Sequence, residues 1–400
     1  MKMKLKELKK FQVPGFLAGG MACGLKKKAV KDLTLIVSEV PATAAGMFTQ
    51  NQMVSPTVPI SQKALKASKT VRAIIANSGN ANAFTGPQGV KDCQTVVTAT
   101  AKALDIPVGE VLTASTGVIS VPLAAHKIEA GIPKLVNLLS PKGWEQAAEG
   151  IMTTDLVSKT CAVQYGEIIV GGISKGSGMI QPNMATMLAF LASNIRIDKR
   201  TLQKALKAAV DPTFNCITVD GETSTNDMVL LLANGQAGNP AVKAGSKAYK
   251  DFVSALTHVC KVLAFKIVED GEGATKFVTF KVSGAKTVMQ AEQIGKRLAN
   301  SLLVKTALFG EDPNWGRIIA AVGSAGVLIK PEKLEVVLNG TPLVKNGEHV
   351  KGVSLSALQK KMKSREINID IDLHMGKASA ETYTCDLSYD YVRINAEYTT

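Results

Sequence analysis

Apolar and polar positions along this chain alternate in two ways, and each way predicts a different element. The strictest period-two pattern runs over 366–373, where Ile367, Ile369 and Ile371 share one face and polar residues share the other. This alternation predicts a half-buried antiparallel strand. Further strands are predicted at 33–40 (ending before Pro41), 71–76, 111–113, 216–219, 228–233, 277–282 and 334–338, and hairpins at 162–173 and at 382–387 with 391–398.

Helical spacing of apolar residues fills the segments between these strands. Asp198 stands directly before one such segment and is a plausible N-cap. Helices are predicted at 90–103, 128–139, 144–152, 198–210, 246–265 and 287–305, with a last one opening at Asn314. Strands and helices therefore mix without a regular βαβ rhythm, which favours an α/β fold built of α+β layers.

Composition narrows the class of protein. The 400 residues are 46% hydrophobic and 20% charged, as in a globular chain. No apolar run approaches the roughly 20 residues of a membrane span, and no signal-peptide core follows the basic N-terminus, so we expect a cytoplasmic protein with no membrane partner. The six cysteines are scattered and show no Cys/His cluster, which favours reduced thiols and no metal site.

The net charge of +14 raises the alternative of a nucleic-acid-binding protein. The lysines, however, are spread through helical segments, and only 5% of residues are aromatic and able to stack on bases. We therefore expect no nucleic-acid partner. Steep salt-dependent binding to RNA or DNA would favour the alternative.

One stretch carries more information than any other. Residues 175–187 read KGSGMIQPNMATM and lead into the apolar run at 187–192. Gly176 and Gly178 permit tight turns, and Pro182 restricts the backbone before it. The pattern delivers Thr186 at the start of a buried strand. From the pattern alone, Thr186 is an ordinary β-branched strand residue, as most threonines before apolar runs are.

This stretch resembles, nearly letter for letter, the self-cleavage segment of the ornithine acetyltransferase (glutamate N-acetyltransferase) family. Further blocks similar to the family follow in the family's order at 77–83, 115–117, 153–155, 219–227, 270–277 and 312–317. The resemblance spans nearly the whole chain. It implies an αββα sandwich of the N-terminal-nucleophile type, like that of the self-cleaving aminopeptidases.

The resemblance also implies that the chain cuts itself between Ala185 and Thr186. The products would be an α chain of residues 1–185 and a β chain of residues 186–400, which together form one intertwined catalytic unit. The freed Thr186 then carries an α-amine whose ordinary pKa lies near 7.7–8.0, so this amine can take the hydroxyl proton. Such a base is needed because a threonine hydroxyl alone is a poor nucleophile.

The family implies roles for further residues. Its oxyanion hole matches Thr116 and Gly117, although their spacing alone describes a simple turn after a strand. Its substrate-binding residues match Lys175, Glu272 and one threonine of the pair Thr153 and Thr154, of which we favour Thr153. They also match Thr186, Asn395 and Thr400. A solvated lysine and a frayed polar tail are the plain alternatives for Lys175 and for the last residues.

The implied activity is acetyl transfer from N2-acetylornithine to glutamate in arginine biosynthesis, with no metal or organic cofactor. Some family members also use acetyl-CoA as a co-substrate, and the sequence leaves both kinds open. Family members assemble as heterotetramers of two α and two β fragments. The nearest alternative is a self-cleaving N-terminal-nucleophile aminopeptidase or amidohydrolase, in which water replaces glutamate as the acceptor.

Overall fold

The computed structural model describes residues 4–27, 29–181 and 187–397 of the chain. These residues form two compact units. The first unit contains the described residues of Met1–Asn215 and Glu222–Ile267, and the second contains those of Cys216–Gly221 and Val268–Thr399. Within the described residues, no helix is long and apolar enough to cross a bilayer.

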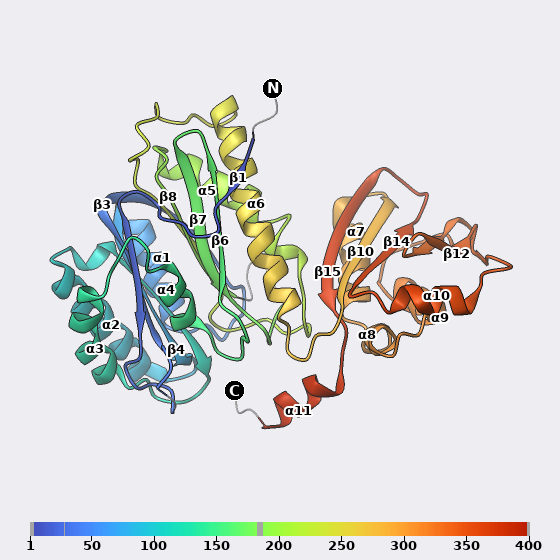
Figure 1. Cartoon of the computed structure of the whole chain (residues 1–400), viewed down its shortest axis with the longest axis horizontal. Coiled ribbons are helices and arrows are strands. Elements are labelled where there is room, and N and C mark those ends of the chain that lie inside the picture. Colours follow the sequence, from blue (N-terminus) through green and yellow to red (C-terminus); the bar gives the residue numbers. More distant parts are fainter. Residues whose placement is uncertain (1–3, 28, 182–186, 398–400) are drawn as a thin grey trace. The chain divides into compact units, whose positions relative to one another are not determined.

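The first unit is built on strands that pair in the order β1-β6-β7-β8-β9-β3-β4-β5, with β2 also paired to β3 (Figure 1). The strands are β1 (Lys6–Glu7), β2 (Phe16–Met21), β3 (Leu33–Phe48), β4 (Val71–Asn80), β5 (Val111–Val118), β6 (Lys159–Tyr165), β7 (Ile168–Lys175), β8 (Leu188–Ser193) and β9 (Met228–Ala233). The predicted hairpin at 162–173 and the predicted strand at 228–233 are confirmed.

The long strand β3 belongs to two sheets. Its first part pairs with β2 and β4, its second part pairs with β9, and the register shifts between Val37 and Ala42. The prediction that this strand ends before Pro41 is wrong. A proline can stand at a bulge, where the ladder needs no N–H donor, so the strand bends into the second sheet and continues.

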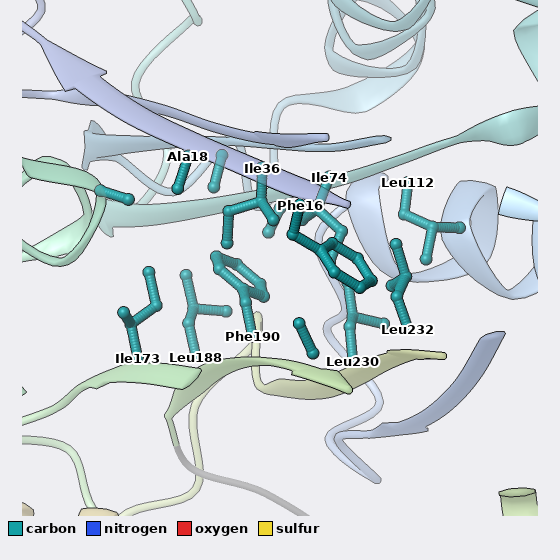
Figure 2. Close-up of a cluster of buried hydrophobic side chains, with 14 of the residues drawn as sticks. Phe16, Ala18, Ile36, Ile74, Leu112, Ile173, Leu188, Phe190, Leu230 and Leu232 are labelled. Carbon is teal, nitrogen blue, oxygen red and sulfur yellow. The ribbon is translucent and has the colours of Figure 1, made fainter. Parts of the chain in front are cut away.

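The main core of the first unit lies between these two sheets. Ile36, Ile74 and Leu112 extend from one sheet, and Phe190 and Leu230 extend from the other (Figure 2). All residues of β8 and β9 are buried, which explains why their sequences are continuous apolar runs and do not alternate. Burying each large side chain contributes roughly 1.5–3 kcal/mol.

Helices pack against both sheets, and some of them also contribute side chains to the main core. The first-unit helices are α1 (Thr57–Ala67), α2 (Gly86–Leu104), α3 (Ala125–Asn137), α4 (Trp144–Ile151), α5 (Lys199–Val210) and α6 (Lys247–Glu269). Residues of α2 and α3 share a core with β3 and β4, α5 packs on β3, and Lys266 of α6 donates to the Thr160 carbonyl of β6 at 2.8 Å. The expected αββα sandwich is confirmed. The side chain of Asp198 caps α5 by accepting from the Thr201 N–H at 3.0 Å, as predicted.

The second unit is a sheet in the order β13-β12-β11-β14-β10-β15 with helices beside it. Its elements are β10 (Phe277–Ala285), α7 (Val288–Ala299), α8 (Leu302–Phe309), α9 (Trp315–Gly323), β11 (Glu335–Leu338), β12 (Thr341–Lys345), β13 (Glu348–His349), α10 (Leu355–Met362), β14 (Glu366–Asp372), β15 (Ala378–Cys385) and α11 (Tyr389–Glu397). Strand β14 alternates as predicted, but it pairs parallel to β10 as well as antiparallel to β11.

Three further predictions are wrong. The segment 287–305 forms two helices and not one. Helix α7 ends at Ala299, and the Ser301 side chain then caps α8 by accepting from the Val304 N–H. The segment 216–219 is no strand and makes one bridge, from Ile217 to Tyr383. The last hairpin is replaced by α11, since Ser388 donates to the Gly273 carbonyl at 2.6 Å and leads the chain away from β15.

Candidate active site

The end of strand β5 holds Thr116 and Gly117, the predicted oxyanion pair. Both lie within the strand, which is longer than predicted, and they pair in parallel with Ser78 and Gly79 of β4. Gly117 has φ +130°, and a Cβ placed on it would lie 2.4 Å from the carbonyl carbon of Gly79. The two strands approach so closely that only glycine fits at this position.

Buried hydrogen bonds fix the end of β5 in place. The Asn226 amide donates to the Ser115 carbonyl at 2.8 Å and to the Ala81 carbonyl at 2.6 Å. The Ser115 hydroxyl donates to the Asn77 side-chain oxygen at 2.7 Å. These contacts join three of the sequence blocks at 77–83, 115–117 and 219–227. A network whose members are all satisfied makes the backbone beside Thr116 rigid.

Lys175 is the last residue of β7, and its side chain reaches the end of β5. Its ammonium donates to the Thr116 hydroxyl oxygen at 3.4 Å, and only 7% of the residue is exposed. The structure therefore brings two predicted site residues together from different sheets. The Thr116 oxygen accepts from Lys175, so its own O–H proton remains available for another acceptor.

Asp155 lies next to this site and accepts hydrogen bonds from three of the described residues. The donors are the Gly176 N–H at 2.7 Å, the Thr153 N–H at 2.9 Å and the Lys159 ammonium at 2.7 Å. Burial raises the pKa of this carboxyl, but the charges of Lys175 and Lys159 outweigh burial and lower it to about 2. The carboxylate therefore stays ionised throughout the neutral range.

Thr153 lines a cavity of about 470 Å³ beside this carboxylate. The lining also includes Asp155 and Lys26, whose ammonium donates to the carbonyls of Lys31 and Met152 at 3.0 and 2.8 Å. Burial lowers the pKa of Lys26, and the neighbouring ammonium of Lys175 acts in the same direction. A polar cavity with ammonium groups on its wall suits an anionic group of a small molecule.

The predicted cleavage site, Ala185 and Thr186, lies outside the described residues, which resume at Met187. Strand β8 then pairs in parallel with β9, so Met187 stands opposite Asp227, and the Met228 N–H donates to the Met187 carbonyl at 3.0 Å. Asp227 is 3% exposed, and within the described part of the chain its Oδ2 has no hydrogen-bond partner. Burial raises the pKa of its carboxyl well above the usual range, against the opposing effects of Ser224 and Lys175.

Glu272 and Asn395 lie in the second unit and contact each other. The Asn395 amide donates to Glu272 Oε2 at 2.8 Å and to the carbonyl of Tyr391, which lies one turn earlier in α11, at 3.0 Å. Glu272 is buried, and Gly273 beside it has φ +69°. The third predicted residue of this region, Thr400, lies outside the described residues.

Several residues on which this site depends could not be singled out from the sequence. Asp155, Asn226 and Asp227 stood within the recognised blocks without an assigned role. Each is an acid or amide in a loop, and this pattern is too common to select it from the sequence. Among the described residues, no group of three or more His, Cys, Asp or Glu side chains is arranged to hold a metal ion.

Comparison with known proteins gives one consistent result. The model of the ArgJ family matches residues 17–400. The "Arginine biosynthesis bifunctional protein ArgJ" of Symbiobacterium thermophilum is 43% identical over 392 residues, covering 96% of this chain and 97% of that protein. The protein "ArgJ 1" of Nostoc sp. is 44% identical over 398 residues, covering 96% of both chains.

Solved structures agree with these matches. The crystal structure of the arginine biosynthesis bifunctional protein from Bacillus halodurans is 41% identical. It covers 53% of this chain and 100% of the crystallised chain, with a TM-score of 0.52.

Proposed function

Because the chain belongs to the ArgJ family, we propose that it transfers an acetyl group from N2-acetylornithine to glutamate through an acetyl ester on Thr186. Family membership makes the chain an enzyme, a transferase of arginine biosynthesis. The observation that carries the proposal is the contact between Lys175 and Thr116. Lys175 is paired with Leu188, the first residue of β8, and Thr186 comes shortly before this strand in the sequence.

The first step of the proposed mechanism is self-cleavage. The Thr186 hydroxyl attacks the Ala185 carbonyl, the peptide nitrogen leaves as the new α-amine, and water hydrolyses the ester. Strands β8 and β9 support this reading, because they carry the residues after the cut and pair between β7 and β3 in one sheet. The fragments 1–185 and 186–400 would thus stay joined by a shared core.

Acetyl transfer then uses the freed amine as a base. The α-amine takes the hydroxyl proton of Thr186 while the oxygen attacks the acetyl carbonyl of N2-acetylornithine. The C–N bond breaks, the proton passes to the leaving ornithine amine, and an acetyl ester remains. The amine of glutamate attacks that ester, releases Thr186 and becomes N-acetylglutamate.

Both tetrahedral intermediates carry a negative oxygen, which needs fixed donors. In the proposal these are the Thr116 hydroxyl and the Gly117 N–H, each worth roughly 3–4 kcal/mol. Their support is the rigid end of β5, where Asn226 and Ser115 hold the backbone. Donors that do not reorganise during the reaction stabilise charge best.

Both substrates carry an α-carboxylate, and ornithine also carries a side-chain amine. We assign the carboxylate to Lys175 and Thr153, whose surroundings are rich in ammonium groups. The amine would be bound by Glu272 with Asn395 and Thr400. The Glu272–Asn395 hydrogen bond supports a role for these two residues as a pair.

The remaining parts of the proposal come from the family resemblance. No metal or organic cofactor takes part, and acetyl-CoA is a possible co-substrate for direct acetylation of glutamate. The cleaved chain would assemble as a heterotetramer of two α and two β fragments in the cytoplasm.

The test is an acetyl-transfer assay with purified protein, N2-acetylornithine and glutamate, without acetyl-CoA. The proposal predicts N-acetylglutamate and ornithine in equal amounts, and neither product with Thr186→Ala. Free acetate with no N-acetylglutamate would contradict it and favour a hydrolase. A parallel assay with acetyl-CoA and glutamate alone decides whether the co-substrate is used.

A further inference from the structure

Asp155 joins parts of the chain that are distant in sequence. Its side chain is fully buried, and its two oxygens accept from Thr153, Lys159 and Gly176. Thr153 lies in the loop after α4, Lys159 begins β6, and Gly176 follows the last residue of β7. One carboxylate therefore fixes the relative positions of three segments.

Two of these three contacts lead directly to residues that we assign to the substrate. Thr153 itself lines the cavity, and its backbone is bound to Asp155 Oδ2. Lys175 immediately precedes Gly176, whose N–H is bound to Oδ1, and its ammonium contacts the Thr116 hydroxyl. Movement of the Asp155 carboxylate would therefore shift both Thr153 and Lys175, the two residues that we assign to the substrate carboxylate.

The third contact, the ion pair with Lys159, supports a simpler role. Both side chains of this pair are 0% exposed. Removing one partner of a buried pair leaves an uncompensated charge and is strongly destabilising, whereas removing both is often neutral. Asp155 would then serve only to neutralise Lys159, without a role in substrate binding.

Asp155 has more neighbours than the pairing with Lys159 needs, which argues against that simpler role. Asp155 faces Lys175 and Lys159, and Lys26 faces Asp155, Asp32 and Lys175. Lys175 faces Asp227 as well. A partner for Lys159 alone would not also need to bind the N–H groups of Thr153 and Gly176. Hydrogen bonds to an ionised carboxylate are short and strong, so these two contacts fix the relative geometry of the two segments.

We propose that Asp155 is a positioning residue that sets the distance between Thr153 and Lys175 and thereby the binding of the substrate carboxylate. The proposal rests on the function proposed above. The carboxylate does not touch the reacting atoms, so its effect is transmitted through the backbone of Thr153 and through the Lys175–Gly176 peptide. A misplacement of about 1 Å at such a site can cost on the order of 100-fold in rate.

The test compares three variants in the acetyl-transfer assay and in thermal unfolding. Asp155→Asn leaves Lys159 buried without its carboxylate, so this variant should lose thermal stability. Asp155→Asn/Lys159→Met removes both charges, so its melting temperature should return toward wild type. Its kcat/KM for N2-acetylornithine should nevertheless stay on the order of 100-fold low, mainly through a higher KM. Asp211→Asn is the control, because it breaks the exposed pair with Lys207 at the same i,i+4 spacing.

The outcomes separate the readings. If the double variant recovers both stability and kcat/KM, Asp155 serves only Lys159 and the proposal is overturned. If the double variant does not fold, Asp155→Glu decides, because it keeps the charge but moves it by one methylene. That variant should raise KM, and an unchanged KM would overturn the proposal. A wild-type protein without acetyl transfer would overturn the proposed function and this inference with it.

Discussion

Gly117→Ala perturbs the proposed oxyanion hole without removing any polar group. The added Cβ would lie 2.4 Å from the Gly79 carbonyl carbon and 2.5 Å from the Asn80 nitrogen. Both are backbone atoms of β4, which is held in the sheet on either side by β3 and β5. The clash therefore cannot be relieved by rotating a side chain.

The distances set the size of the effect. Carbon atoms reach favourable contact at about 3.5 Å, so the end of β5 must move by about 1 Å. A displacement of about that size costs on the order of 100-fold in rate, equivalent to about 2.7 kcal/mol of barrier. The φ of +130° adds a separate strain of about 1–3 kcal/mol to the folded state, because side chains other than glycine rarely adopt it.

Gly166→Ala is the matched control, because it shares the positive φ but not the clash. Gly166 has φ +53° in the β6–β7 turn, and a Cβ there would meet nothing within 4 Å. Self-cleavage is read on a denaturing gel and acetyl transfer from N-acetylglutamate formation, with circular dichroism to check folding. Gly117→Ala should be on the order of 100-fold slower than Gly166→Ala. Equal rates in the two folded variants would contradict the proposed oxyanion hole at Thr116 and Gly117.

Further predictions concern stability. Phe190→Ala should lose about 3–5 kcal/mol in denaturant unfolding because Phe190 is fully buried between the sheets (Figure 2); a loss below about 1 kcal/mol would contradict the described core. The pKa of Asp155 is lowered from 3.8 to about 2. The ionised carboxylate should therefore contribute about 2 kcal/mol to the free energy of unfolding above pH 4. This contribution should disappear as the pH falls toward 2, and Asp155→Asn/Lys159→Met should not show that loss. Asp227 has a raised pKa, so its contribution is present at low pH and lost as the pH rises through the raised value. As the pH rises, the melting temperature of Asp227→Asn should therefore increase relative to that of wild type. A relative decrease would contradict the raised pKa of the buried Asp227 carboxyl.

Local sequence patterns predicted much of the fold because they reflect interactions between residues that are close in the sequence. The apolar run at 228–233 became β9 with those bounds, and Asp198 capped α5 as its position before an amphipathic segment indicated. Two of the failures have one cause, namely contacts with distant segments. Neither the passage of β3 through Pro41 nor the helix α11 can be read locally, because a partner strand stabilises one and the Ser388–Gly273 hydrogen bond directs the other.

The candidate site was predicted as a set of motifs and not as a geometry. The sequence named Thr116, Lys175 and Thr153, and the structure brings the first two into contact. The sequence could not show that Asp155 accepts a hydrogen bond from Gly176, which is 21 residues away. Nor could it show that the Asn226 amide binds the Ser115 carbonyl across a separation of 111 residues. Such pairings depend on how the sheets stack, which no local pattern encodes.

The proposed function depends most on Thr186 becoming a chain end that carries the acetyl group. The most direct test is mass spectrometry and N-terminal sequencing of purified protein incubated with N2-acetylornithine and no glutamate. The proposed function predicts two fragments. The second begins at Thr186 and is heavier by one acetyl group, which is lost when glutamate is added. A single intact chain that still transfers acetyl groups would contradict it.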